Sequence, residues 1–242
     1  MRVVVTRPQH SGERTMRRLV QMGHEPLLLP LAEPVHDVEE ARRALLATQG
    51  AVAVTSAEAI RALSLLDSDL APHLGRRLFA VGKATAKEAA DLGFSNIAIS
   101  EGGGTELAAI ISGHPLGLND GPLLYLAGSP RAAGFEAGLA ERHLPFLTIE
   151  CYRMQNIVPD DNVLRRLFAD TRADAVLLYS HKTAKRFFSL PFVRHNPGIL
   201  AETRFLCLSE TIASAVPEPM RSHVDIADMP NEDRLMALLI HA

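Results

Sequence analysis

The chain has 242 residues, of which 47% are apolar, 22% are charged and 5% are aromatic. A formal net charge of −3, scattered basic residues and the lack of Trp argue against a nucleic-acid partner, which needs basic patches and stacking platforms. No apolar stretch approaches the roughly 20 residues of a membrane span, and the first residues do not form a signal peptide. We therefore expect a cytoplasmic globular protein with two domains of about 100–130 residues each.

Short apolar strands alternate with amphipathic helices along the chain. The strands are expected at 2–6, 27–29, 51–54, 78–81, 97–99, 123–126, 145–152, 175–179, 205–208 and 224–227. The helices are expected at 12–22, 37–47, 57–63, 84–92, 106–111, 130–143, 162–168, 183–190, just after 209 and from 230 to 240. Thr55 and Glu58 form a capping-box pattern, which places a strand-to-helix turn at Thr55/Ser56. This alternation favours parallel sheets with helices on both faces, with five strands in each domain.

The same order of elements occurs twice in the chain. Three stretches recur at nearly constant offsets: 51–63 at 175–187, 78–86 at 205–213, and 2–30 at 123–150. The blocks of the two copies follow different orders, so the copies are related by a circular permutation.

The permuted repeat predicts an α/β protein of two similar parallel-sheet domains, one inserted into the other. Residues 1–34 and 154–242 form the expected discontinuous first domain, and residues 36–150 form the expected inserted domain. The two crossings are extended and run in opposite directions, so we expect them to pair as a two-stranded connection.

Signatures of metal, nucleotide and nucleophile chemistry are missing from the sequence. The ten histidines have no metal-ligand spacing, and C-x-x-C, H-E-x-x-H and G-x-S-x-G are absent. No G-x-G-x-x-G follows the opening strand, and the glycines at 102–104 lack the rest of a P-loop. Cys151 and Cys207 lie in apolar strand patterns and are expected to be buried free thiols.

Hydroxyl and basic side chains recur where the expected strands give way to helices. In an open α/β sheet this carboxyl edge is the usual ligand site, and helix N-termini favour anions. Helix capping is a sufficient explanation for each residue taken alone. Taken together, and arranged around a cleft between two domains, these residues would suit the binding of a flexible polyanion. The candidate binding residues are Arg7, Ser56, Lys83, Thr85, Arg131, Ser180, Thr183, Ser209 and Thr211.

Short motifs along the whole chain resemble the uroporphyrinogen-III synthase family. They are V-T-R-P at 5–8, the run from Leu19 through Gly23 to Pro30, Thr55-Ser56, G-x-x-T-A at 82–86, and the strand end at 149–152. Two places depart from the family pattern. The second turn of the G-x-x-T-A kind has Ser209 in place of Gly and Ile212 in place of the second Thr, and Ala127 stands where an Arg is common.

The resemblance implies a lyase of porphyrin and heme biosynthesis, a cytoplasmic monomer that needs neither cofactor nor metal. It implies closure of the linear tetrapyrrole hydroxymethylbilane to uroporphyrinogen III, with loss of water and inversion of the terminal pyrrole ring. The reaction would pass through a spirocyclic intermediate in a cleft between the domains. Transient hand-over of substrate from hydroxymethylbilane synthase is the implied partner interaction.

Tyr152 matches the family's tyrosine near the second crossing. We expect its phenol to face the space between the domains and to donate a proton to the departing hydroxyl, with Cys151 pointing to the opposite face of the strand. A structural role, in which the ring packs and the hydroxyl bonds locally, is the alternative.

Two other classes of function remain open from the sequence. The first is a non-catalytic two-domain binding protein for a small anionic ligand, and the second is a Rossmann-type transferase. Incubation with hydroxymethylbilane and separation of the uroporphyrin isomers discriminates between these classes and the synthase.

Overall fold

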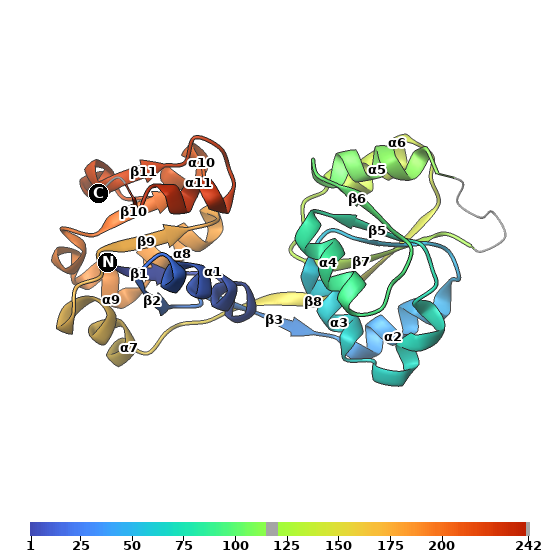
Figure 1. The fold of residues 1–242 in the computed structure, drawn as a ribbon, viewed down its shortest axis with the longest axis horizontal. Coiled ribbons are helices and arrows are strands. Elements are labelled where there is room, and N and C mark those ends of the chain that lie inside the picture. The colour runs from blue at the N-terminus through green and yellow to red at the C-terminus, as the bar shows by residue number, and fades with distance from the viewer. Residues whose placement is uncertain (115–120, 241–242) are drawn as a thin grey trace. The chain divides into compact units, whose positions relative to one another are not determined.

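The structure is a computed structural model that describes residues 1–114 and 121–240. Its contacts divide the chain into two compact units (Figure 1). The first unit comprises Met1–Glu33 and Gln155–Ala242, and the inserted unit comprises Pro34–Met154. The chain therefore crosses between the units twice, although independent folding of either unit stays a prediction.

The first unit contains a parallel sheet with the strand order β11-β10-β9-β1-β2. Its strands are β1 (Arg2–Val5), β2 (Glu25–Leu28), β9 (Ala175–Leu178), β10 (Arg204–Cys207) and β11 (Val224–Ile226). Its helices are α1 (Gln9–Gln21), α7 (Asp161–Arg165), α8 (His181–Ser189), α9 (Pro191–His195), α10 (Glu210–Ala213) and α11 (Glu232–Ala237). Val3 and Val5 pack on the face that α1 and α11 cover, whereas Val4 packs on the face that α8 covers. Both faces are apolar, as a parallel sheet requires.

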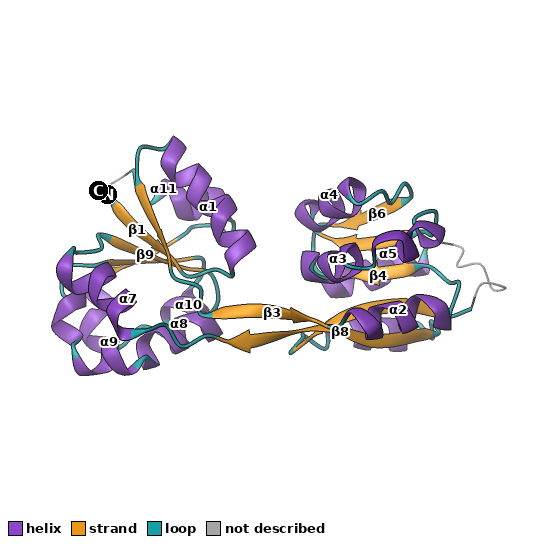
Figure 2. Cartoon of the chain, turned by 90° about the horizontal axis from the view of Figure 1, so that it is seen from below, coloured by secondary structure: helices purple, strands orange, loops and turns teal. Residues whose placement is uncertain are grey.

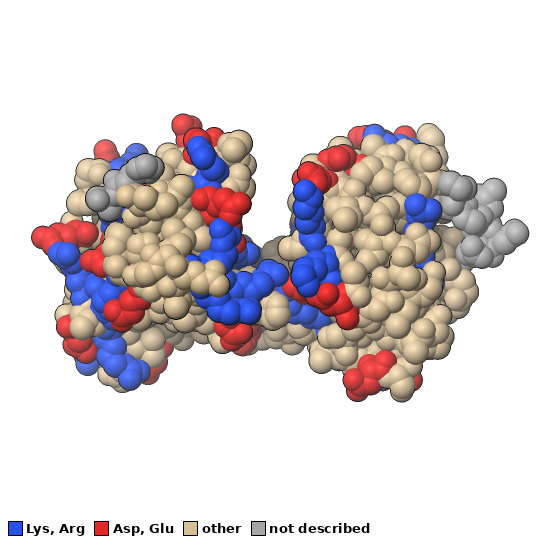
Figure 3. All heavy atoms as spheres, in the orientation of Figure 1, with Lys and Arg blue, Asp and Glu red and all other residues tan. Residues whose placement is uncertain are grey.

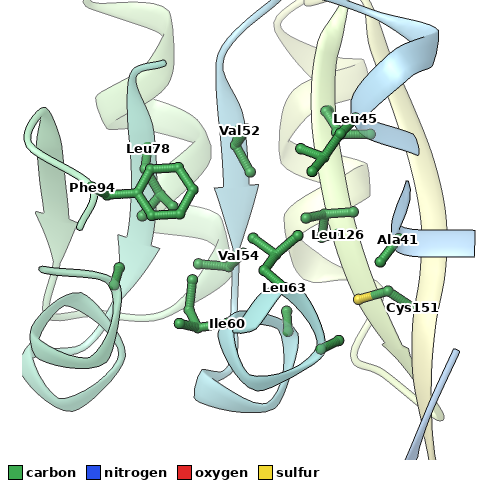
Figure 4. Packing of buried hydrophobic residues seen from close by; sticks show 14 of the residues in the cluster. Ala41, Leu45, Val52, Val54, Ile60, Leu63, Leu78, Phe94, Leu126 and Cys151 are labelled. Atoms are coloured by element: carbon green, nitrogen blue, oxygen red, sulfur yellow. The ribbon is translucent and has the colours of Figure 1, made fainter. Parts of the chain in front are cut away.

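The inserted unit contains a sheet with the order β3-β8-β7-β4-β5-β6. Its strands are β3 (Ala32–His36), β4 (Val52–Val54), β5 (Leu78–Val81), β6 (Ile97–Ser100), β7 (Leu123–Ser129) and β8 (Phe146–Asn156). Its helices are α2 (Val38–Ala47), α3 (Ala57–Ser64), α4 (Lys83–Asp91), α5 (Gly104–Ser112) and α6 (Gly134–Glu141). One face packs against α2, α3 and α4 through residues such as Leu45, Leu63 and Leu126 (Figure 4). The other face packs against α5 and α6 through Leu107 and Leu139.

The two sheets have matching strand orders. The order β2-β1-β9-β10-β11 in the first unit corresponds to β8-β7-β4-β5-β6 in the inserted unit. Four of these five pairs lie in the stretches that the permuted sequence repeat matches, and β6 with β11 completes the set, so the expected α/β architecture is confirmed.

The expectation of five strands in each domain is wrong for the inserted unit. Its sheet has a sixth described strand, because β3 pairs with β8 along the edge. Figure 2 shows β3 and β8 running in opposite directions. The strands belong to the two segments that carry the chain between units, and they form the expected two-stranded connection.

Two local expectations at helix starts are also corrected. The helix expected from Pro130 begins only at Gly134, because β7 continues to Ser129. The capping-box pattern predicts Thr55 as the N-cap of α3, but the N-cap is Ser56. Its Oγ accepts a hydrogen bond from the backbone N of Glu58 at 3.2 Å.

Candidate functional site

A pocket of about 380 Å³ lies at the carboxyl edge of the inserted sheet. Parallel strands β4, β5 and β7 all end at this edge, so the turns that follow them converge there. The polar side chains that line the pocket are those of Thr55, Ser56, Thr105, Tyr125, Arg131 and Tyr152. Three of the sequence candidates, Ser56, Arg131 and Tyr152, are therefore brought together.

A β-bulge sets the position of Tyr152 on β8. Ala127 of β7 pairs with Glu150 and the next residue, Gly128, pairs with Tyr152, so Cys151 is the extra residue. Cys151 is fully buried, and its Sγ donates to the backbone O of Ala127 at 3.6 Å. Both Cys151 and Tyr152 pack against the cluster beneath α2, α3 and α4. The expectation that Cys151 points to the opposite face is wrong, because the bulge interrupts the alternation of side chains.

Burial keeps the Cys151 thiol protonated. It raises the pKa of Cys151 to about 12, and a backbone hydrogen bond opposes that rise only in part. A neutral thiol enclosed in the core is a packing group.

The Tyr152 ring lies directly over the backbone of β7 at Gly128. A Cβ at position 128 would lie 2.5 Å from Cε2 of Tyr152 and closer still to Cζ and Oη, so only glycine admits the ring. Burial is the main cause that raises the pKa of Tyr152, and interaction with the Ser56 hydroxyl opposes that rise. The phenol is therefore protonated at neutral pH, as a proton donor must be.

Tyr125 is a pocket residue that the sequence reasoning missed. Its Oη and Thr55 Oγ1 are hydrogen-bonded at 2.9 Å, and its ring meets Phe135 edge-on with centroids 4.7 Å apart. Burial raises the pKa of Tyr125, so this phenol also stays neutral. Tyr125 lies within the apolar run of β7, and a Tyr in a buried strand is normally interpreted as a core residue, so no sequence pattern marked it as a pocket residue.

Arg131 is held by two carboxylates. Its Nε donates to Glu136 at 2.8 Å and its Nη1 donates to Glu150 at 2.5 Å. These hydrogen bonds raise the pKa of Arg131, and the bond from Arg131 is the main cause that lowers the pKa of Glu136. Glu136 also accepts from Thr148 at 2.9 Å. A ligand carboxylate at Arg131 must therefore compete with side chains of the unit itself.

The two candidates on α4 are placed apart from the pocket lining. Lys83 is 80% exposed and forms an ion pair with Glu101 at 2.9 Å. Thr85, two residues further along the helix, is buried. Either could reach a ligand only beyond the pocket of the inserted unit.

In the first unit, Arg7 is part of a closed polar cluster. The carboxylate of Glu232 accepts from Arg7 at 2.8 Å, from Thr15 at 2.6 Å, from Tyr179 at 2.9 Å and from Arg18 at 3.1 Å. The Arg7 guanidinium also stacks 4.5 Å from the centre of the Tyr179 ring. Burial would raise the pKa of Glu232, but these donors together lower it. The charge of Arg7 is thus matched within its own unit.

The remaining candidates of the first unit stand at two helix starts. Ser180 caps α8: its Oγ accepts from the backbone N of Thr183 at 3.1 Å and donates to Thr183 Oγ1 at 2.8 Å. Ser209 stands at the N-cap of α10 but makes no side-chain capping bond. Thr211 is exposed, and its backbone O lies 2.7 Å from Nδ1 of His181.

Basic and acidic side chains intermingle on the visible face of each unit (Figure 3). Across residues 1–114 and 121–240, no group of three or more His, Cys, Asp or Glu side chains is arranged to hold a metal ion. Over the same residues, no helix is long and apolar enough to cross a membrane.

Comparison with known proteins places the chain in a family. A family model described as uroporphyrinogen-III synthase HemD matches residues 13–237. The structure of uroporphyrinogen-III synthetase from Helicobacter pylori is similar, with a TM-score of 0.65, 17% identity, and coverage of 100% of this chain and 99% of that one. A mutant uroporphyrinogen III synthase from Thermus thermophilus has a TM-score of 0.53 and 18% identity, with coverage of 100% and 96%. No curated protein sequence matches the chain. The chain belongs to the uroporphyrinogen-III synthase family and is an enzyme of tetrapyrrole biosynthesis.

Proposed function

We propose that this enzyme converts hydroxymethylbilane to uroporphyrinogen III by inverting the terminal pyrrole ring through a spirocyclic intermediate. Membership of the family supports the overall reaction. The observation that carries the residue-level proposal is the position of Tyr152, whose protonated phenol lies over Gly128 and lines the pocket at the carboxyl edge of the sheet.

In the proposed first step, Tyr152 donates its proton to the terminal hydroxyl of the substrate. The carbon–oxygen bond breaks, water leaves, and the pyrrole system becomes an electrophilic azafulvenium cation, whose positive charge balances the phenolate that remains on Tyr152. Attack by a carbon of the terminal ring then forms the spirocycle, which fragments and closes in the inverted sense. The proton released from the pyrrole carbon at final closure restores the phenol, so atoms and charges balance.

The enzyme must favour the spirocyclic route over direct closure, which occurs without a catalyst. Holding the flexible polyanion in one conformation accomplishes this, because a fixed geometry removes the entropy cost of reaching the reactive arrangement. Within the pocket, Arg131 and Ser56 are the proposed carboxylate contacts, together with the N-terminal backbone of α5 at Gly104 and Thr105.

The proposal also retains contacts from both units. The further proposed contacts are Arg7, Lys83, Thr85, Ser180, Thr183, Ser209 and Thr211. For Arg7, a substrate carboxylate would have to replace Glu232 as its partner. A cytoplasmic monomer that receives substrate by hand-over from hydroxymethylbilane synthase completes the proposal.

Separation of the product isomers tests the proposed reaction. Purified protein is incubated with hydroxymethylbilane, and the uroporphyrins formed after oxidation are resolved by chromatography, beside an enzyme-free reaction. The expected result is type III in large excess over the uninverted type I. An isomer ratio equal to that of the enzyme-free reaction would refute the proposal and favour an anion-binding protein.

A further inference from the structure

His36 is a half-buried histidine that stands beside Tyr152 without lining the pocket. It is the last residue of β3, which pairs with β8, and the backbone N of Asp37 donates to the O of Cys151 at 2.8 Å. The ring centroids of His36 and Tyr152 are 6.4 Å apart, with the planes tilted by 57°. The imidazole therefore flanks the Tyr152 ring from the edge strand of the sheet.

The orientation of the His36 ring is fixed by α3. Its Nε2 lies 3.2 Å from Oε2 of Glu58, whose side chain is only 12% exposed. Arg61 donates to Glu58 and, at 2.5 Å, to Glu88, so the Glu58 carboxylate cannot swing freely. The charged partner of His36 is thus Glu58, which Arg61 links to Glu88 in an array from α3 and α4.

One short segment links this array to the phenol. Ser56 lines the pocket together with Tyr152, interacts with its phenol so as to lower the pKa, and accepts a hydrogen bond from the backbone N of Glu58. The same turn thus holds the Tyr152 hydroxyl through Ser56 and the His36 ring through Glu58. Gly128 supports the Tyr152 ring with backbone only, which leaves His36 as a side-chain support for the ring on the β3 side.

We infer that His36 is a positioning residue for Tyr152: the imidazole, held by Glu58, keeps the phenol ring over Gly128 with its hydroxyl at Ser56. An ordinary packing role for His36 would stabilise the unit without affecting the orientation of Tyr152. The contact itself is independent of the reaction, whereas its effect on turnover rests on the proposed function.

Fluorine NMR tests the contact without any activity measurement. The chain has three Tyr and no Trp, so full-length protein labelled with 3-fluorotyrosine gives three resonances, and Tyr152→Phe assigns one of them. We expect His36→Ala to shift the Tyr152 resonance and to leave that of Tyr179, in the first unit, unchanged. An unshifted Tyr152 resonance in folded His36→Ala protein would overturn the inference.

A matched control and a second variant keep this test decisive. His114 contacts the ring of Phe79 in the same unit, with centroids 5.5 Å apart, so His114→Ala removes a comparable aromatic contact and should not shift the Tyr152 resonance. If His36→Ala does not fold, His36→Gln replaces it, because glutamine retains a donor for Glu58 while removing the ring. The same shift of the Tyr152 resonance is expected.

A double-mutant cycle tests the consequence for turnover. We expect His36→Ala to lower kcat about 10-fold with KM nearly unchanged, because a misplaced catalytic group slows the chemical step. In a Tyr152→Phe background the same change should lower kcat by less than about twofold, because there is no hydroxyl left to position. Equal losses in the two backgrounds would refute action through Tyr152. Failure of the isomer assay in the unmodified protein would instead refute the proposed function and leave the NMR result standing.

Discussion

The carboxyl edges of the two sheets have the same strand order but different contents. Helix α11 of the first unit and helix α5 of the inserted unit both follow the outermost strand of their repeat. At its start α11 carries Glu232, whose carboxylate binds Arg7 and Tyr179. At its start α5 carries Gly104 and Thr105, and both line the pocket. The Glu232 carboxylate therefore occupies the edge of the first sheet, whereas Gly104 has no side chain to fill the pocket at the edge of the inserted sheet.

The comparison shows how two copies of one fold acquire different roles. Arg7 follows β1, and Arg131 follows β7, the equivalent strand of the inserted unit. Each of these arginines is paired with carboxylates of its own unit. The difference lies in the tyrosines, since Tyr179 donates to Glu232 while Tyr152 lines the pocket. We therefore propose proton donation at the inserted edge, whereas Tyr179 and Glu232 stabilise the first unit.

The sharpest test compares Tyr152→Phe with Tyr179→Phe. We expect Tyr152→Phe to lower kcat by about 10²–10⁴-fold, the usual effect of losing a general acid, with type III still the enzymatic product. The matched Tyr179→Phe should leave kcat nearly unchanged and lower the free energy of unfolding by about 1 kcal/mol. Similar turnover losses in both variants, measured at saturating substrate, would contradict the division of roles.

The second test concerns the glycine under the Tyr152 ring. Gly128→Ala should lower kcat about 100-fold, because the new Cβ occupies the place of the ring and displaces the phenol. In a Tyr152→Ala background the ring is absent, so Gly128→Ala should destabilise the protein less than it does in the unmodified protein, while turnover stays low. Normal turnover in the single variant would show that the phenol need not lie where the structure places it.

The third test breaks the cluster of the first unit. Glu232→Gln should lower the free energy of unfolding at pH 7 by about 2 kcal/mol, less than for a fully buried pair because the carboxylate is partly exposed. The folded pKa of Glu232 lies below its ordinary value of 4.5, so its stabilisation is present above pH 4.5 and is lost as pH falls through the folded value. Denaturant unfolding at a series of pH values should show the two proteins converging in acid. A constant difference would assign the loss to packing.

A smaller effect distinguishes the two arginines. Arg131→Gln should raise KM about tenfold, the loss of one charge-assisted contact, because Arg131 lines the pocket. Arg7→Gln should raise KM no more than about threefold, because the Arg7 guanidinium lies in the cluster around Glu232. Steady-state kinetics measure both. Equal effects would mean that the first edge opens and that Arg7 exchanges Glu232 for a substrate carboxylate.

The least perturbing test asks whether the inserted unit folds by itself. The fragment 34–154 contains the inserted unit's core clusters and should unfold cooperatively, with no partner chain required. Circular dichroism during thermal denaturation measures this. A soluble fragment without a cooperative transition would show that the boundary between the units is not a boundary between folding domains.

Local patterns in the sequence determined the elements and their order. Strand and helix periodicities and the permuted repeat are patterns of residue types along the chain, so they can be read without coordinates. They led to the two matching sheets and placed Tyr152 on the strand of the second crossing, but as its last residue, whereas β8 continues to Asn156.

Tertiary structure alone decided how these parts meet. The bulge that turns Tyr152 and Cys151 toward one cluster depends on the register between β7 and β8, and a one-residue shift reverses every side chain. Glu232 reaches Arg7 across 225 positions of sequence, and Thr55 meets Tyr125 across 70. Such contacts depend on the packing of whole elements, because no local preference of either residue specifies a partner so far along the chain.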